Sequence, residues 1–187
     1  MKKEFYQSEN FWSDDSKYKR IDYPINDEII KKTEIILDVK LPSSLVDLMK
    51  IKNGGGLNYP YFILPDGDTE SIPYGERARI SEIDPIHFEN DDMSILSSEE
   101  LLKEVKLTGK FVVLWTDFHY WVVLDYRSRS QDPAVIYIAE NFSASTYDTT
   151  EWEYIKIADT FDGFLKQLFR VPPLEPKQLK ISYSRKE

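Results

Sequence analysis

The sequence predicts an α+β fold in which an antiparallel β-meander packs against helices from both ends of the chain. Two observations support this fold class. Residues 111–127, FVVLWTDFHYWVVLDYR, contain two runs of β-branched and aromatic residues separated by a break at residues 117–119, a pattern typical of a hairpin. Apolar residues at helical spacing occur both before this hairpin and near the end of the chain.

Three helices are expected before the hairpin. The first spans residues 25–39, with Asn26 or Asp27 as its N-cap. The second begins at Pro42 and ends at the glycines 54–56. A short third helix follows Ser97, whose spacing to Glu100 matches a capping box. The buried face of the first helix is expected to contain Ile25, Ile29, Ile30, Thr33, Ile36 and Leu37.

Further strands and a last helix are expected on either side of the hairpin. The expected strands are residues 59–64, 79–83, 134–139 and, at an edge, 154–157. Both faces of 120–124 are apolar, so this strand should be covered on both sides. Asp159 or Thr160 should cap the last helix, in which Phe161, Phe164, Leu165 and Leu168 point inward.

The chain is expected to form a single domain over residues 1–170. Phe11 and Trp12 should anchor an otherwise irregular segment 1–24 to the core, because large apolar side chains are seldom solvated. Residues 171–187 contain three prolines and few apolar groups, so we expect an extended tail.

The acidity of the chain is concentrated in one block. The net charge is −9, and residues 66–104 contain twelve acids and three bases, which accounts for all of it. The remaining residues contain 21 acids and 21 bases. Such a block repels nucleic acid and attracts basic protein surfaces. The simpler interpretation is a solvated face that aids solubility.

Several classes of site find little support. No cysteine is present, which excludes disulfides and thiolate nucleophiles. The segment from Asp66 lacks the glycine and glutamate of a calcium-binding loop, and glycines 54–56 lack a following phosphate-binding lysine. Asp117 and His119 could form an acid/base pair, although a surface turn is the simpler interpretation. We therefore expect no catalysis, cofactor, metal or nucleic acid.

No apolar segment is long enough for a signal peptide core or a membrane span. A cytoplasmic protein without membrane contact, monomeric by default, is the expectation. Trp115 and Trp121 could form a stacking platform, but their place within strong strands favours a role in the core.

Five motifs, in this order, resemble the SUKH superfamily over about residues 11–170: FWSDDSKY, LPSSLVDLMKIKNGG, LDYR, DPAVIYI and TFDGFLKQLF. The superfamily contains yeast regulators of cell-wall glucan synthesis and many bacterial immunity proteins. The resemblance implies an α+β domain without catalytic residues. The residues that match its motifs, most of them interpreted as fold-determining, are Leu41, Pro42, Asn53, Gly54, Gly55, Leu124, Asp125, Tyr126 and Arg127.

The resemblance and the charge pattern together predict an immunity protein that neutralises a cognate toxin, such as a basic nuclease or deaminase domain. The alternative is an intracellular scaffold or regulator of cell-wall synthesis. Acidic contacts are expected at Asp66, Asp68, Asp84, Glu89, Asp91 and Asp92. Aromatic anchors are expected at Tyr59, Tyr61 and Tyr74.

Overall fold

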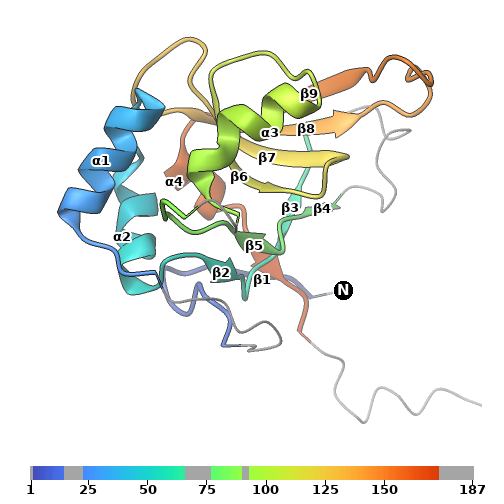
Figure 1. The fold of residues 1–187 in the computed structure, drawn as a ribbon. Coiled ribbons are helices and arrows are strands. Elements are labelled where there is room, and N and C mark those ends of the chain that lie inside the picture. Colours follow the sequence, from blue (N-terminus) through green and yellow to red (C-terminus); the bar gives the residue numbers. More distant parts are fainter. Residues whose placement is uncertain (1, 15–22, 66–76, 90–92, 173–187) are drawn as a thin grey trace, which may run out of the picture.

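The computed structural model describes residues 2–14, 23–65, 77–89 and 93–172 (Figure 1). It confirms the α+β fold and the antiparallel meander. The central sheet consists of four strands in sequence order, each antiparallel to the next. These strands are β6 (Phe111–Thr116), β7 (Tyr120–Asp125), β8 (Ala134–Glu140) and β9 (Trp152–Ala158).

Both faces of the central sheet are covered, as the two apolar faces of β7 predict. The larger core lies on the face that contains Val122 and Leu124, and it includes residues from α1, α2 and α4. The smaller core lies on the face of Trp121 and Val123, against α3. The described helices are α1 (Asp27–Leu37), α2 (Ser43–Ile51), α3 (Ser98–Glu104), α4 (Phe161–Leu165) and the 3₁₀ helix η2 (Ile95–Ser97).

Two smaller antiparallel sheets complete the described fold. Their strands at residues 61–63 and 82–83 fall within the expected strands 59–64 and 79–83, whereas those at 4–5, 55–56 and 169–170 were not expected. One sheet has the order β1-β10-β3-β4, and in the other β2 pairs with β5. The strands are β1 (Glu4–Phe5), β2 (Gly55–Gly56), β3 (Tyr61–Ile63), β4 (Arg77–Arg79), β5 (Glu82–Ile83) and β10 (Phe169–Arg170). The N-terminal segment is therefore not wholly irregular, since β1 forms an edge strand beside β10.

The anchoring role of Phe11 and Trp12 is confirmed. Both side chains are buried, and their rings meet edge to face at 4.9 Å. The Trp12 indole N–H donates to the carbonyl of Leu48, at 2.9 Å, so the anchor is also hydrogen-bonded to α2. Tyr6 adds a further edge contact to Phe11 at 5.3 Å. The N-terminal segment is thus held against α2 by both apolar and polar contacts.

Several helix boundaries follow the predicted caps, and others do not. The side chains of Asn26 and Thr160 cap α1 and α4 as predicted. The capping box is wrong, because Ser97 makes no capping hydrogen bond with its side chain. Ser98 is the important hydroxyl instead: it donates to the Ile95 carbonyl and accepts from the Val113 amide, so it ties α3 to β6.

Two details of the predicted buried faces are also wrong. Ile36 on α1 is exposed, whereas Ile30 and Thr33 are buried. The last helix ends at Leu165, so Leu168 lies beyond it, although its side chain is buried. The chain leaves the helix early because residues 169–170 pair with β1 and β3. Tertiary pairing has overridden the local helical spacing here.

The Asn53–Gly54 motif joins the end of α2 to the loop after β5. The Asn53 amide group donates to the Ile86 carbonyl at 2.8 Å, and its oxygen accepts from the Ile86 amide at 2.8 Å. It also donates to the Tyr23 carbonyl at 3.1 Å. Asn53 itself is buried, so these bonds satisfy backbone groups that water does not reach.

The LDYR motif fixes the end of β7 to the α1–α2 connection. Tyr126 is buried and its hydroxyl donates to the Lys40 carbonyl at 2.8 Å. Arg127 donates from Nε and Nη2 to the two carboxylate oxygens of Asp125, each at 2.9 Å. Burial alone would raise the pKa of Asp125, but the hydrogen bonds and the charge of Arg127 hold that pKa below its usual value.

The Asp125–Arg127 pair should therefore make stability depend on pH. A carboxyl with a lowered pKa in the folded state stabilises fully above its unfolded pKa of about 3.9, and this contribution is lost as the pH falls through the folded pKa. We expect Asp125→Asn to lower the free energy of unfolding by about 1 kcal/mol at neutral pH. Urea unfolding should show this difference shrinking in strong acid. A difference that is constant from neutral to strongly acidic pH would contradict the assignment.

Candidate partner-binding surfaces

The predicted contact residues fall into three groups in the structure. Asp66, Asp68, Tyr74, Asp91 and Asp92 lie outside the described residues. Glu89 is exposed, in the loop that follows β5, as a surface contact requires. The remaining three, Tyr59, Tyr61 and Asp84, are within the described residues and are partly or fully buried.

Asp84 and Tyr59 are part of the interior, which contradicts their prediction as surface contacts. Asp84 is 5% exposed, and its backbone amide donates to the Leu114 carbonyl of β6 at 3.0 Å. Tyr59 is 8% exposed and meets the Tyr6 ring at 5.4 Å. Tyr61 is half-buried on β3, with the Arg77 guanidinium 5.1 Å from its ring. Of the three, only Tyr61 keeps a solvent-facing surface.

Three acids of the acidic block lie on α3, which the structure describes in full. Glu99, Glu100 and Glu104 are exposed, while Leu101 and Leu102 of the same helix are buried against the sheet. Lys103 is the one base on this helix. The amphipathic pattern therefore turns three carboxylates to solvent on one side of the molecule. Sequence analysis counted these acids in the block but did not select them as contacts.

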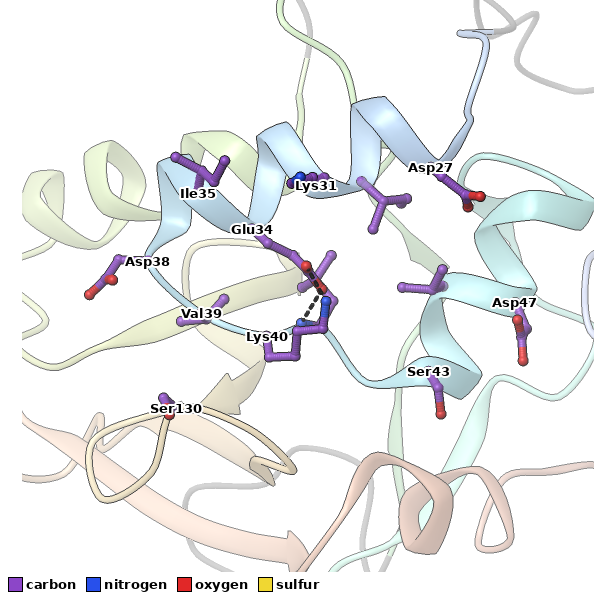
Figure 2. Close-up of a pocket in the computed structure, with 13 residues that line it drawn as sticks. Asp27, Lys31, Glu34, Ile35, Asp38, Val39, Lys40, Ser43, Asp47 and Ser130 are labelled. Atoms are coloured by element: carbon purple, nitrogen blue, oxygen red, sulfur yellow. Dashed lines mark hydrogen bonds and ion pairs between the residues drawn. The ribbon is translucent and has the colours of Figure 1, made fainter.

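A separate groove lies between α1 and α2 and was not predicted (Figure 2). It is open and has a volume of about 810 Å³. Figure 2 shows Glu34 and Lys40 paired with each other in the groove, with Asp27 and Asp47 at one end and Asp38 at the other. Its apolar lining residues are Ile30, Ile35, Val39, Leu41 and Val46.

Most acids at this groove already have a basic partner. Lys40 lies 2.5 Å from Glu34, and this carboxylate also accepts the Leu41 amide. Hydrogen bonds from Lys50 and Lys110, together with their charge, lower the pKa of Asp27 and of Asp38. Among the described lining residues there is no histidine. Three of the four acids that line the groove, Asp27, Glu34 and Asp38, are therefore already ion-paired within the protein.

The two histidines have structural partners. His87 is buried, stacks on Tyr23 at 4.0 Å, and its Nε2 lies 2.8 Å from the Met93 carbonyl. His119 faces Glu140, with Nδ1 and Oε2 2.6 Å apart.

The possible Asp117–His119 acid/base pair is not formed between side chains. The Asp117 carboxylate accepts the backbone amides of His119 and Tyr120, at 3.1 and 2.8 Å. It therefore caps the turn between β6 and β7, which is the simpler of the two interpretations. The described residues contain no group of three or more His, Asp or Glu side chains placed to hold a metal ion.

Residues 24–167 match the family model of the SMI1 / KNR4 family (SUKH-1). The match covers well over half of the chain. The chain belongs to the SMI1/KNR4 family. The resemblance drawn from the sequence motifs is thereby confirmed. No curated protein and no solved structure matches the chain in the corresponding comparisons.

The SMI1/KNR4 match includes the central sheet and α1 to α4, whereas β1 and β10 lie outside it. The superfamily includes immunity proteins and cell-wall regulators. Membership therefore establishes the fold without determining which of these roles this chain has. None of the described helices has the length and apolar character needed to cross a lipid bilayer.

Proposed function

We propose that the chain is an immunity protein that binds a cognate protein toxin and blocks it without catalysis. Two observations support this function. The chain belongs to a family whose superfamily includes immunity proteins. Its whole net charge of −9 falls within residues 66–104. The concentrated charge is the observation that carries the proposal, because it suits a basic partner.

The chemistry of the toxin explains why an acidic surface would inhibit it. A nuclease or a nucleic acid deaminase must bind a phosphate backbone, so its active-site surface is rich in lysine and arginine. An inhibitor with a dense acidic face would occupy the same surface and exclude the substrate. Attraction between the two surfaces would also accelerate encounter. Glu89, Glu99, Glu100 and Glu104 are the described, exposed carboxylates of the block that would act in this way.

Reversing charges on α3 should slow association with the toxin. We expect Glu99→Lys combined with Glu100→Lys to lower the association rate constant about tenfold at low salt. The dependence of that constant on salt should also become weaker. Surface plasmon resonance over a series of salt concentrations would measure both. Both side chains are exposed, so the change removes no buried contact. The lysines lose the favourable interaction of acids with the first turn of α3, while Glu100→Lys removes the like-charge pair with Glu104.

Glu9→Lys provides a matched control. Glu9 is exposed and lies outside the acidic block, so one reversal there changes the net charge by the same amount as one reversal on α3. A double variant of Glu9 and Asp162, both exposed, matches the full change. If the control and the α3 variant slow association equally, only net charge matters. If neither changes it, the block on α3 is a solvated face.

The alternative function is a scaffold or regulator of cell-wall synthesis. The family name, SMI1 / KNR4, and the regulators within the superfamily favour it. A scaffold of this kind would have several partners of lower affinity, whereas an immunity protein would have one partner of high affinity. Isothermal titration with a purified toxin domain encoded beside this chain distinguishes the two. A stable complex with one toxin molecule per chain favours immunity.

A further inference from the structure

The β6–β7 turn and the β8–β9 loop lie at the same end of the central sheet (Figure 1). Both of these hairpin tips carry exposed aromatic side chains. Phe118, in the turn between β6 and β7, is 45% exposed. Phe142 and Tyr147, in the loop between β8 and β9, are 52% and fully exposed. Single exposed apolar residues are ordinary, but several on neighbouring loops are typical of an interaction site. Tyrosine and phenylalanine are also enriched among residues that anchor protein interfaces.

The two tips are held to each other by direct contacts. The His119 ring lies 2.6 Å from the Glu140 carboxylate and 5.5 Å from the Phe142 ring. The Glu140 backbone amide donates to the His119 carbonyl at 2.9 Å. Phe142 also meets the Tyr120 ring at 6.5 Å. These contacts place Phe142 of the longer loop beside His119 and Tyr120 of the β6–β7 hairpin, whereas the Phe118 ring meets Trp121 at 6.0 Å on the other face of the sheet.

The longer loop has its own hydrogen bonds. The Asn141 side chain accepts the amides of Ser143 and Ala144, each at 3.1 Å. Further along, the Thr146 amide donates to the Thr149 carbonyl at 2.8 Å, and the Glu151 amide donates to the Ser145 hydroxyl at 3.0 Å. These hydrogen bonds hold the loop in this conformation, which we expect to persist in the unbound protein. Binding would then require little additional ordering of the backbone, which favours affinity.

The formal charges at these two tips are all negative. Asp117, Glu140, Asp148 and Glu151 lie on the two loops or at their bases. Segments 115–121 and 139–155 contain no lysine or arginine. A surface of aromatic rings with acids beside them is complementary to arginine and lysine, whose cations are attracted to both.

We propose that these two tips form a docking surface for a basic segment of the partner protein, with Phe142 and Tyr147 as its aromatic anchors. The hairpin-tip surface consists of Asp117, His119, Glu140, Phe142, Tyr147, Asp148 and Glu151. The identity of the partner rests on the proposed function, since a toxin would be the source of that segment. The hairpin-tip surface and the acidic block have different roles. The long-range charge of the acidic block governs the association rate constant, whereas packing against the aromatic rings governs the dissociation rate constant.

The first test uses a defined probe and does not require the toxin. A short peptide of alternating arginine and leucine is titrated into the ¹⁵N-labelled full chain, and the amide shifts are followed by NMR. We expect saturable shifts at residues 117–120 and 140–151. The double variant Phe142→Ala/Tyr147→Ala should lower the affinity at these residues at least about tenfold. A matched peptide with glutamate in place of arginine should not bind.

Two results of this titration would overturn the proposal. One is an absence of saturable shifts at the hairpin-tip surface. The other is an equal affinity of the wild-type chain and the double variant. Ile51→Ala is the matched control, because Ile51 is 77% exposed at the end of α2 and outside the hairpin-tip surface. Its affinity for the peptide should equal that of the wild-type chain.

A second test uses the toxin domain and separates this inference from the proposed function. The Phe142→Ala/Tyr147→Ala variant should dissociate about 30-fold faster than the wild-type chain, with a nearly unchanged association rate. If the wild-type chain binds the toxin and the variant dissociates at the same rate, the docking surface is wrong and immunity stands. If the wild-type chain binds no toxin, the proposed function fails, and the peptide titration decides the docking surface by itself.

Discussion

Replacing Gly54 with alanine is expected to lower the free energy of unfolding by about 3 kcal/mol. Gly54 has φ +81°, a conformation that is unfavourable for residues with a Cβ. A Cβ atom here would also lie 2.7 Å from the Pro85 nitrogen and 2.9 Å from the Ile83 carbonyl oxygen. Both are backbone atoms, so neither can move without disturbing the loop that Asn53 holds through Ile86. Urea unfolding monitored by tryptophan fluorescence would measure the loss.

Gly56→Ala provides the control for this prediction. A Cβ at Gly56 would meet no atom closer than the Ser13 Cβ, at 3.6 Å, which is ordinary van der Waals contact. Gly56 also lacks a positive φ. We expect a change of less than about 1 kcal/mol. If both variants lost the same free energy of unfolding, the close approach of the Pro85 and Ile83 backbone to Gly54 would not be the reason for glycine at this position.

Replacing Phe62 with alanine should be at least as damaging, at about 4 kcal/mol. Phe62 lies on β3 and is fully buried. Its ring meets Phe164 of α4 at 5.4 Å and Tyr137 of the central sheet at 5.8 Å, both edge to face. This one side chain therefore connects the β1-β10-β3-β4 sheet, the central sheet and the last helix. The loss combines removed apolar contact with the cavity that remains.

Phe142→Ala is the matched control for Phe62. Phe142 is 52% exposed, so its removal should change the free energy of unfolding by no more than about 0.5 kcal/mol. Thermal or urea unfolding of the two variants side by side would measure the difference. A small loss for Phe62→Ala would contradict the packing described for the larger core. A large loss for Phe142→Ala would show that the hairpin-tip surface has a structural role.

The central meander could be predicted because its signals are local. Strands β6 to β8 each contain at least three consecutive residues of high β propensity, and turn residues separate them. Three of the short strands could not be predicted in the same way. Strands β1, β2 and β10 have two residues each, too few for any periodic pattern. Pairing with distant segments creates them, and such pairing leaves no local trace in the sequence.

The contact residues were harder to predict from the sequence than the fold was, for two physical reasons. Burial cannot be read from charge alone, so Asp84 was expected at the surface although it is 5% exposed. Summing the charge over all residues outside 66–104 also concealed a second acidic region. Outside the block the charges balance, yet residues 116–155 contain seven acids and two bases. Counting charge in shorter windows, together with the exposed turn and loop, would have indicated the hairpin-tip surface.

We propose that this chain neutralises a cognate toxin by binding it. The most direct measurement is a co-expression rescue, in which cells produce the toxin domain encoded beside this chain with or without the chain. We expect survival only when the chain is present, and a purified complex of one toxin and one chain. Cells that die in both cases, with the chain instead bound to several proteins of cell-wall synthesis, would contradict immunity and establish the regulator.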